Sequence, residues 1–340
     1  MSKITRNFSK LRVGVACNIK TDHSSEEQAE FDEPQTVAAI CAALEEGGFE
    51  TAVLEAADEF PQKLEAAAPD IVFNIAEGKS GRCREAQIPA ILEYYGVPFT
   101  GSDAAALSIA MDKALTKQIA QSLGIETPPY YVIRKGDAEF PDKLSFPLLV
   151  KPNAEGSSMW ISDTSIAGDT AELRGLVNRL TDGYDGDLLA EAYIDGREFT
   201  VGIIGNGSRL RVFDPMEIIF YKQKGPYKIY SYEIKQNFKN YIRYECPPNL
   251  PEETIARMKN SAEGIYETLG CLDFARIDFR LSENGTVYFI EVNPLPGLNP
   301  GYSDFPMLAG YHGIPYNSLI RAILHCALKR YGIKAGINNE

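Results

Sequence analysis

The sequence lacks the features of a membrane protein and of a histidine- or cysteine-based metal protein. No apolar run approaches a membrane span, and the N-terminal stretch MSKITRNFSKLRVGV is charged, so we predict a cytoplasmic protein with no membrane contact. It has only three histidines, widely separated, and six cysteines without CxxC spacing. A histidine-based metal site or triad therefore has little support, and the cysteines are expected to be reduced packing residues.

Positive charge is also scarce. The formal net charge is −13, which argues against nucleic acid as a partner because phosphate backbones attract basic surfaces. A nucleotide is not excluded, since it needs only a few local lysines. The content of 44% hydrophobic and 24% charged residues is typical of a soluble globular protein, and 340 residues suggest two or three domains.

The first hundred residues alternate between strand and helix patterns. Helices are predicted at 34–46, where Pro34 lies in the first turn, and at 85–95, where Gly96 follows the last turn. Strands are predicted at 12–17, 51–54, 70–75 and 97–100. This order predicts a parallel, Rossmann-like layer of strands and helices.

The next segment begins with a helix predicted at 107–124 and continues with a second, smaller α/β unit. A strand at 146–151 delivers Lys151 to its end, before a Gly/Ser loop at 152–158 whose backbone N–H groups could wrap phosphates. Further strands are predicted at 188–193 and 199–204. The polar, tyrosine-rich stretch 221–238 lacks apolar periodicity, which suggests a long functional loop or lid.

The stretch FARIDFRLSENGTVYFIEVN predicts a β-hairpin with a two-residue turn at Asn284-Gly285. In that register Asp278 lies opposite Glu291, and Arg276 lies opposite Asn293. Because side chains alternate along a strand, all four share one face of the hairpin. Alternation places apolar side chains on the other face: Ile277, Phe279, Ile290 and Val292.

Two carboxylates directly opposite one another on paired strands are destabilising, so this arrangement suggests a bound cation. Ligands that are all oxygen atoms favour Mg²⁺ or Mn²⁺. The alternative is a hairpin whose charge pair is relieved by Arg276 or by protonation. The Gly/Pro-rich loop after Asn293 places these polar groups at a strand end, where α/β proteins commonly bind ligands.

Several motifs in order give the chain a resemblance to ATP-grasp ligases, most closely the D-alanine–D-alanine ligase group. These are MDK at 111–113, VKPNAEGSS at 150–158, LLAEAYIDGREFTV at 188–201, YSYEIK at 230–235, RIDF from Arg276 and EVNPLPG from Glu291. The resemblance covers nearly the whole chain. It implies an N-terminal Rossmann-like domain at 1–106, a central ATP-grasp subdomain at 107–187 and a C-terminal ATP-grasp subdomain at 188–340, which holds the metal site and a lid loop at 221–238.

The resemblance also implies which residues bind ATP. Lys113 and Lys151 would hold the α- and β-phosphates, while Glu191 and Glu198 would bind the adenine amino group and the ribose hydroxyls. Lys235 would contact the transferring phosphate. Ala192, Ile194 and Ile290 would border the nucleotide, and the loop from Glu155 to Ser158 would close over the γ-phosphate.

For the metal and the chemistry, the resemblance implies that Asp278, Glu291 and Asn293 bind two Mg²⁺ or Mn²⁺ ions. Arg276 would stabilise the oxyanion of the tetrahedral intermediate. Glu33 and Ser157 match two members of a cluster at the first amino acid.

For the amino acid substrates, Ser303 matches the serine that binds the second substrate's carboxylate. Glu33 or Glu77 could meet a substrate ammonium, and Arg82 or Arg84 could pair with a carboxylate. The alternative for Arg82 and Arg84 is that they are solvated loop charges.

Departures from the family pattern are concentrated on the amino acid side. Gln236 follows Lys235 where a tyrosine is expected, and Glu77-Gly78 replaces a His-Gly pair. We therefore expect an ATP-dependent carboxylate–amine ligase that joins amino acids, or an amino acid and another amine, through an acyl phosphate. The alternatives are a D-alanine–D-alanine ligase of peptidoglycan synthesis and a non-catalytic ATP-binding regulatory protein. The expected partners are small amino acids, and a homodimer is a family expectation.

Overall fold

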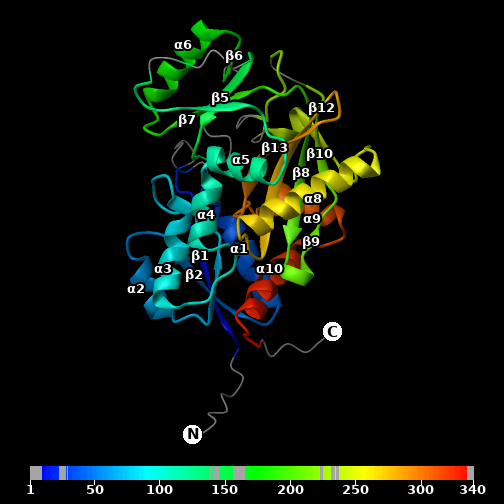
Figure 1. The fold of residues 1–340 in the computed structure, drawn as a ribbon. Coiled ribbons are helices and arrows are strands. Elements are labelled where there is room, and N and C mark those ends of the chain that lie inside the picture. The colour runs from blue at the N-terminus through cyan, green and yellow to red at the C-terminus, as the bar shows by residue number, and fades with distance from the viewer. Residues whose placement is uncertain are drawn as a thin grey trace.

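The computed structural model describes residues 10–22, 28, 30–137, 140, 145–155, 165–222, 225–230, 234 and 237–334. Three β-sheets organise these residues, with helices packed on their faces (Figure 1). The sheets follow one another along the chain: a three-stranded parallel sheet, a four-stranded antiparallel sheet and a six-stranded antiparallel sheet. Within the described ranges, no helix has both the length and the apolarity needed to cross a membrane.

The first sheet has the strand order β2-β1-β3. Its strands are β1 (Arg12–Cys17), β2 (Glu50–Glu55) and β3 (Ile71–Asn74), and its helices are α1 (Pro34–Glu46), α2 (Phe60–Ala67) and α3 (Gln87–Tyr95). The central strand β1 is buried from its second residue onward, as expected for an apolar run covered on both faces. The predicted helix at 34–46 is confirmed with the same bounds. The second predicted helix begins with a short 3₁₀ turn, Arg84–Ala86, before α3.

The strand predicted at 97–100 is wrong. Only one bridge forms there, between Phe99 and Val72. The Val72 N–H donates to the Pro98 carbonyl (2.8 Å), and the Thr100 N–H donates to the Val72 carbonyl (2.9 Å). The ladder ends because the Thr100 hydroxyl, rather than its backbone, then accepts the N–H of Asn74 (3.0 Å).

The single helix predicted at 107–124 is two helices, α4 (Ala104–Met111) and α5 (Lys113–Ser122). Asp112 separates them in an extended conformation (φ −84°, ψ 98°) and caps α5 by accepting the Leu115 N–H (3.0 Å). Its carboxylate also accepts the side-chain amide of Asn153 (2.8 Å). Because Asp112 leaves the helical conformation, Lys113 becomes the first residue of α5.

The second sheet has the order β4-β7-β5-β6, with α6 (Thr170–Thr181) packed against it. Its strands are β4 (Tyr130–Ile133), β5 (Leu148–Pro152), β6 (Ile166–Ala167) and β7 (Leu188–Ala192). In this sheet β7 pairs with β4 and β5, although it follows the predicted boundary at residue 188. The domain boundaries stay a prediction.

The third sheet has the order β11-β10-β8-β12-β13, and β9 pairs with β8. Its strands are β8 (Gly196–Ile204), β9 (Arg211–Val212), β10 (Met216–Phe220), β11 (Ile242–Glu245), β12 (Phe274–Ser282) and β13 (Val287–Asn293). The helix α8 (Glu252–Thr268) buries Met258, Ala262 and Ile265 against one face. The other face carries the polar residues described below.

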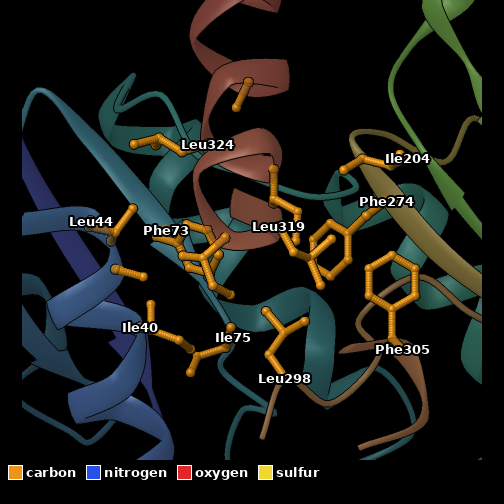
Figure 2. Close-up of a cluster of buried hydrophobic side chains, with 14 of the residues drawn as sticks. Ile40, Leu44, Phe73, Ile75, Ile204, Phe274, Leu298, Phe305, Leu319 and Leu324 are labelled. Carbon is orange, nitrogen blue, oxygen red and sulfur yellow. The ribbon is translucent and has the colours of Figure 1, made fainter. Parts of the chain in front are cut away.

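The largest hydrophobic cluster joins the first sheet to the end of the chain. Figure 2 shows Ile40 of α1 and Phe73 of β3 on one side, and Phe274 of β12 and Phe305 of α9 (Asp304–Tyr311) on the other. The last helix, α10 (Tyr316–Arg330), lies between them through Leu319 and its neighbours. Residues distant in sequence thus form one core, which holds the end of β13 and its following loop against the N-terminal layer.

Candidate active site

The hairpin of β12 and β13 pairs Asp278 with Glu291 and Arg276 with Asn293, as predicted. Thr200 of the neighbouring strand β8 lies beside the pair, and its hydroxyl donates to Asp278 Oδ1 (2.7 Å). The strand that carries Asp278, β12, is therefore paired on both sides, with β13 and with β8.

The two-residue turn, however, is wrong. The Ser282 N–H donates to the Thr286 carbonyl (3.0 Å), so the loop has three residues, and Gly285 adopts the left-handed conformation (φ 84°) that such a turn requires. This longer loop shifts the pairing by one residue, as in Leu281 with Val287. A β-bulge after Asp278 then shifts it back, so the predicted pairs survive because two one-residue differences cancel.

The bulge also changes the face on which Ile290 lies. Phe279 pairs with Phe289 instead of Ile290, and Phe289 is fully buried in the core. Alternation had placed Ile290 on the apolar face, which is wrong because the bulge contributes one extra residue to β13. Ile290 instead lines the smaller of two cavities, beside Glu191 and Ala192.

Arg276 forms a two-pronged contact with Asp278 on this face. Its Nε lies 3.0 Å from Oδ1 and its Nη2 lies 2.9 Å from Oδ2. Burial alone would lower the pKa of Arg276, but Asp278 and Asp304 outweigh burial and raise it. Arg276 therefore relieves the charge of Asp278, which is one of the alternatives that the sequence left open.

Asp278, Glu291 and Asn293 form a donor set of two carboxylates and one amide. The Asn293 amide nitrogen donates to Asp278 Oδ2 (3.2 Å), and the Lys113 ammonium lies 3.6 Å from Glu291 Oε2. Among the described residues, no group of three or more His, Cys, Asp or Glu side chains could hold a metal. The set nevertheless fits Mg²⁺, which is commonly held by one or two carboxylates together with phosphate oxygens and water.

Lys113 reaches this site because α5 begins at it. Its side chain is buried, and its ammonium donates to the Glu155 carbonyl and faces Glu291. The backbone N–H of Lys113 donates to the Asn153 carbonyl (3.0 Å), which ties the start of α5 to the segment after β5. The helix break at Asp112 thus aims this lysine at the hairpin.

A buried charge cluster is formed by Lys151, Glu191 and Lys117, and the first two of these line the smaller cavity. Glu191 Oε1 lies 2.6 Å from the Lys151 ammonium, and Oε2 lies 2.8 Å from the Lys117 ammonium. Burial by itself would raise the pKa of Glu191, but the two ammonium groups outweigh it and hold this pKa at about 2. Burial lowers the pKa of Lys117 to about 8, against the opposing effect of Glu191.

The smaller cavity, of about 100 Å³, brings together most of the residues that the resemblance assigns to the nucleotide. They are Lys151, Glu191, Ala192, Ile194, Glu198 and Ile290. Glu198 lies 3.7 Å from the Arg280 guanidinium across the ladder between β8 and β12. Apolar side chains such as Phe199 and Ile218 complete the wall, which suits a flat aromatic base.

A larger cavity of about 600 Å³ adjoins the smaller one, and Arg276, Glu291 and Asp304 line both. It is lined by the predicted substrate residues Glu33, Glu77 and Ser303, together with Arg276, Glu291 and Asn293. Further carboxylates line it: Glu30, Asp32, Glu85, Glu155 and Asp304. Burial, with Glu33 adding to it, raises the pKa of Asp32 to about 7.

The loop between Glu77 and Arg84 shapes the acidic wall. Gly78 adopts φ +77°, and a Cβ there would meet the Arg84 carbonyl oxygen at 2.0 Å, so the loop closes only around glycine. Arg84 is buried, ion-paired with Glu30 and, at 2.8 Å, with Glu155. The interpretation of Arg84 as a solvated loop charge is wrong, because the loop folds inward. Arg82 has a 67% exposed side chain and pairs with Asp112.

Three predicted site residues lie outside the described residues: Ser157, Ser158 and Lys235. Gln236 also lies outside them. The described part of the phosphate loop ends at Glu155, which lines the larger cavity.

Lys117 and Asp304 are among the residues of the site that were not assigned a role from the sequence. Lys117 lies four positions after Lys113, and that helical spacing was an available signal. Asp304 follows Ser303, lines both cavities and carried no pattern of its own.

Comparison with known proteins shows similarity over most of the chain. The family model for the D-ala D-ala ligase C-terminus matches residues 119–325. A D-alanine–D-alanine ligase of Saccharophagus degradans is 36% identical over 289 residues, which cover 84% of this chain and 87% of that protein. Uncharacterized protein y4sG of Sinorhizobium fredii is 32% identical over 300 residues, covering 86% and 87%.

A solved structure gives the same picture. The crystal structure of a D-alanine–D-alanine ligase from Bacillus anthracis complexed with ATP has a TM-score of 0.75 at 26% identity. The match covers 95% of this chain and 99% of the other.

Proposed function

The chain belongs to the D-alanine–D-alanine ligase family of ATP-grasp enzymes, and from this premise we propose that it joins the carboxylate of an amino acid to an amine through an acyl phosphate. The predicted α/β fold of this family is confirmed. The protein is a ligase that forms carbon–nitrogen bonds and releases ADP. Which acid and which amine it joins is our proposal.

The proposed chemistry begins from a poor acyl donor. A carboxylate becomes reactive when ATP phosphorylates it, because phosphate departs more easily than oxide. An amine then attacks the carbonyl carbon and gives an amide, with ADP and phosphate as the other products. No protein nucleophile is needed, so the task of the residues is to position the substrates and to stabilise charge.

The observation that carries this proposal is the shared face of the hairpin. Arg276 shares this face with the metal-type ligands Asp278 and Glu291 and lines the larger cavity, where it can stabilise a tetrahedral oxyanion. A protein that only binds nucleotide has no need of such an arginine. We assign the divalent ions to Asp278, Glu291 and Asn293, where bound Mg²⁺ would neutralise the triphosphate.

For the nucleotide, we assign the phosphates to Lys113 and Lys151 and the adenine amino group to Glu191. This assignment is supported by the ionised state of Glu191, since a carboxylate can accept a hydrogen bond from that amino group. Lys151 pairs with Glu191 and lines the same cavity, where its ammonium can bind a phosphate. Glu198, Ala192, Ile194 and Ile290 border the nucleotide in this proposal.

For the amino acid, we assign the α-ammonium of the first substrate to Glu33, with Glu77 as the second candidate. Both line the larger cavity. The proposal that Arg84 contacts a substrate carboxylate is weakened, because Arg84 already pairs with Glu30 and Glu155. Ser157, Ser158 and Lys235 keep the roles that the resemblance implies. Cytoplasmic location and dimerisation stay predictions.

A second candidate is a true D-alanine–D-alanine ligase, which is the name carried by several relatives. Coupled ADP release measured with D- and L-amino acids, singly, in pairs and each together with a simple primary amine, separates the two. We expect the highest turnover with an acid and an amine other than D-alanine with itself. If D-alanine alone gives the highest kcat/KM, the second candidate is correct.

A further inference from the structure

Asp304 occupies the part of the larger cavity where a carboxylate of the second substrate would be expected. It is the first residue of α9 and follows Ser303, the serine matched to that carboxylate. Its side chain is only 9% exposed, yet it lines both cavities. A buried acidic side chain at the junction of two cavities faces the place where their contents meet.

The guanidinium of Arg276 has a carboxylate on each side. Nε and Nη2 face Asp278, as described above, and Nη1 lies 3.7 Å from Asp304 Oδ2. A substrate carboxylate that approached the Nη1 side of Arg276 would have to displace Asp304 or lie against it. Two carboxylates in contact repel one another strongly when they are shielded from water.

Asp304 is not free to swing away. The Tyr244 hydroxyl donates to Oδ1 (3.0 Å), the Tyr230 hydroxyl lies 3.5 Å from the same oxygen, and the two hydroxyls lie 2.7 Å apart. The negative charge also lies at the N-terminal end of α9, where the helix dipole favours an anion. The fold therefore holds an anion at this position.

The remaining described cations of the cavity wall do not offer a better site for a second carboxylate. Lys113 faces Glu291. Lys20 belongs to the wall formed with residues 30–33, since its backbone N–H donates to the Asp32 carbonyl (2.9 Å). That wall includes Glu33, which is assigned to the first substrate. A second substrate at Asp304 therefore meets a carboxylate and two tyrosines.

We propose that the attacking substrate is a primary amine with no carboxylate on the carbon next to its nitrogen, and that Asp304 selects it by binding its ammonium form. This inference rests on the proposed function. The amine nitrogen forms the new C–N bond while the C–O bond to phosphate breaks, and phosphate leaves with that electron pair. The ammonium gives up two protons in the process, one to the phosphate and one to solvent.

The test begins with the acyl donor, which is found without any acceptor. Hydroxylamine traps an acyl phosphate as a hydroxamate, so ATP-dependent hydroxamate formation with single amino acids identifies the donor. If no amino acid yields hydroxamate, the proposed function fails. The choice of acceptor is then tested only with a donor already identified.

The acceptor test uses pairs that differ by one carboxylate. Ethylamine is compared with D- and L-alanine, and propylamine with D- and L-2-aminobutyrate, with amide formation measured by mass spectrometry. We expect kcat/KM to be at least about tenfold higher for the amine in each pair, the effect of about one unfavourable charge contact. Equal or higher values for the amino acids overturn the inference while leaving the ligase activity intact.

Asp304→Asn tests the residue itself. It keeps the side chain's size and removes its charge, so we expect the preference for the amine to fall at least about tenfold, with amino acids gaining as acceptors because the Nη1 side of Arg276 becomes available. A gain in one activity cannot come from misfolding. The control is Glu253→Gln, the same charge change on a side chain that is 85% exposed on α8.

Tyr244→Phe provides a second variant if Asp304→Asn folds poorly. It removes the hydroxyl that donates to Asp304 and leaves the carboxylate in place, so the preference for the amine should weaken without vanishing. An unchanged preference in both folded variants assigns selection to another part of the cavity and overturns the role of Asp304.

Discussion

The two cavities that adjoin at the polar face of the hairpin differ in how their charges are balanced. In the smaller one, Glu191 lies between two lysines, Lys117 and Lys151, at 2.8 and 2.6 Å. In the larger one, carboxylates outnumber the cations that line the wall, and Arg84 neutralises Glu30 and Glu155 from behind. A site with matched charges needs no charge from its ligand, whereas a site with surplus negative charge favours a ligand of positive charge.

This difference agrees with the division of labour between the two sides. In the proposed function the smaller cavity binds the nucleotide, and its ion pairs would hold one geometry for that single ligand. In the same proposal the larger cavity binds the amino acid and the amine, whose charges would pair with its fixed carboxylates.

The largest expected effect comes from removing a charge on the balanced side. Lys117→Met should lower the free energy of unfolding by about 4 kcal/mol, because it leaves the buried Glu191 with only one of its two partners. Urea unfolding measures this. Lys63→Met, in which the lost side chain is 39% exposed, is the control and should cost less than about 1 kcal/mol.

The same variant should change the response to acid. The folded-state pKa of Glu191 lies near 2, below its usual value of 4.5, so its contribution to stability is present above pH 4.5 and is lost as the pH falls toward 2. Without Lys117 that pKa rises, and acid unfolding should begin at a higher pH. A variant with unchanged stability and unchanged acid unfolding would contradict the importance of the charge cluster.

The next effect concerns the hairpin face that the two sides share. Asp278→Asn and Glu291→Gln should each fold and lose about 100-fold in Mg²⁺-dependent turnover, since each removes one charge that would oppose the bound cations. Turnover measured across Mg²⁺ concentrations tests this assignment. Near wild-type rates at low Mg²⁺ in either variant would show that the ions bind elsewhere.

The smallest effect belongs to the acidic side. Burial, then Glu30, raises the pKa of Glu85 from 4.5 to about 7. The native state therefore binds more protons than the unfolded state between these values, and this group makes the protein less stable as the pH rises through that window. Glu85→Gln should raise the free energy of unfolding at pH 8 by about 1 kcal/mol, with little change at pH 4.5.

Thermal unfolding at the two pH values measures this effect. Because the larger cavity is expected to bind a cationic group, the stabilisation by Glu85→Gln should be accompanied by weaker binding of the substrate. A Glu85→Gln variant that is no more stable than the wild type at pH 8 would show that the charge of Glu85 does not destabilise the folded protein.

The sequence by itself determined the parts of the site that depend on local pattern. Alternation along β12 and β13 placed Arg276, Asp278, Glu291 and Asn293 on one face, because side-chain direction in a strand depends only on residue number within a register. The motifs that resemble the ligase family identified the residues that line the smaller cavity. The helix at 34–46 was predicted from the proline in its first turn.

Only the tertiary structure decided the features that depend on partners distant in the chain. The break before Lys113 exists because Asp112 bonds to Asn153, and the burial of Arg84 exists because Glu30 and Glu155 receive it. The position of Asp304 against Arg276 depends on the packing of α9 beneath the hairpin, which brings together residues 28 positions apart in the sequence. These contacts have no local signal, because the energy that forms them comes from charges that meet only in the folded chain.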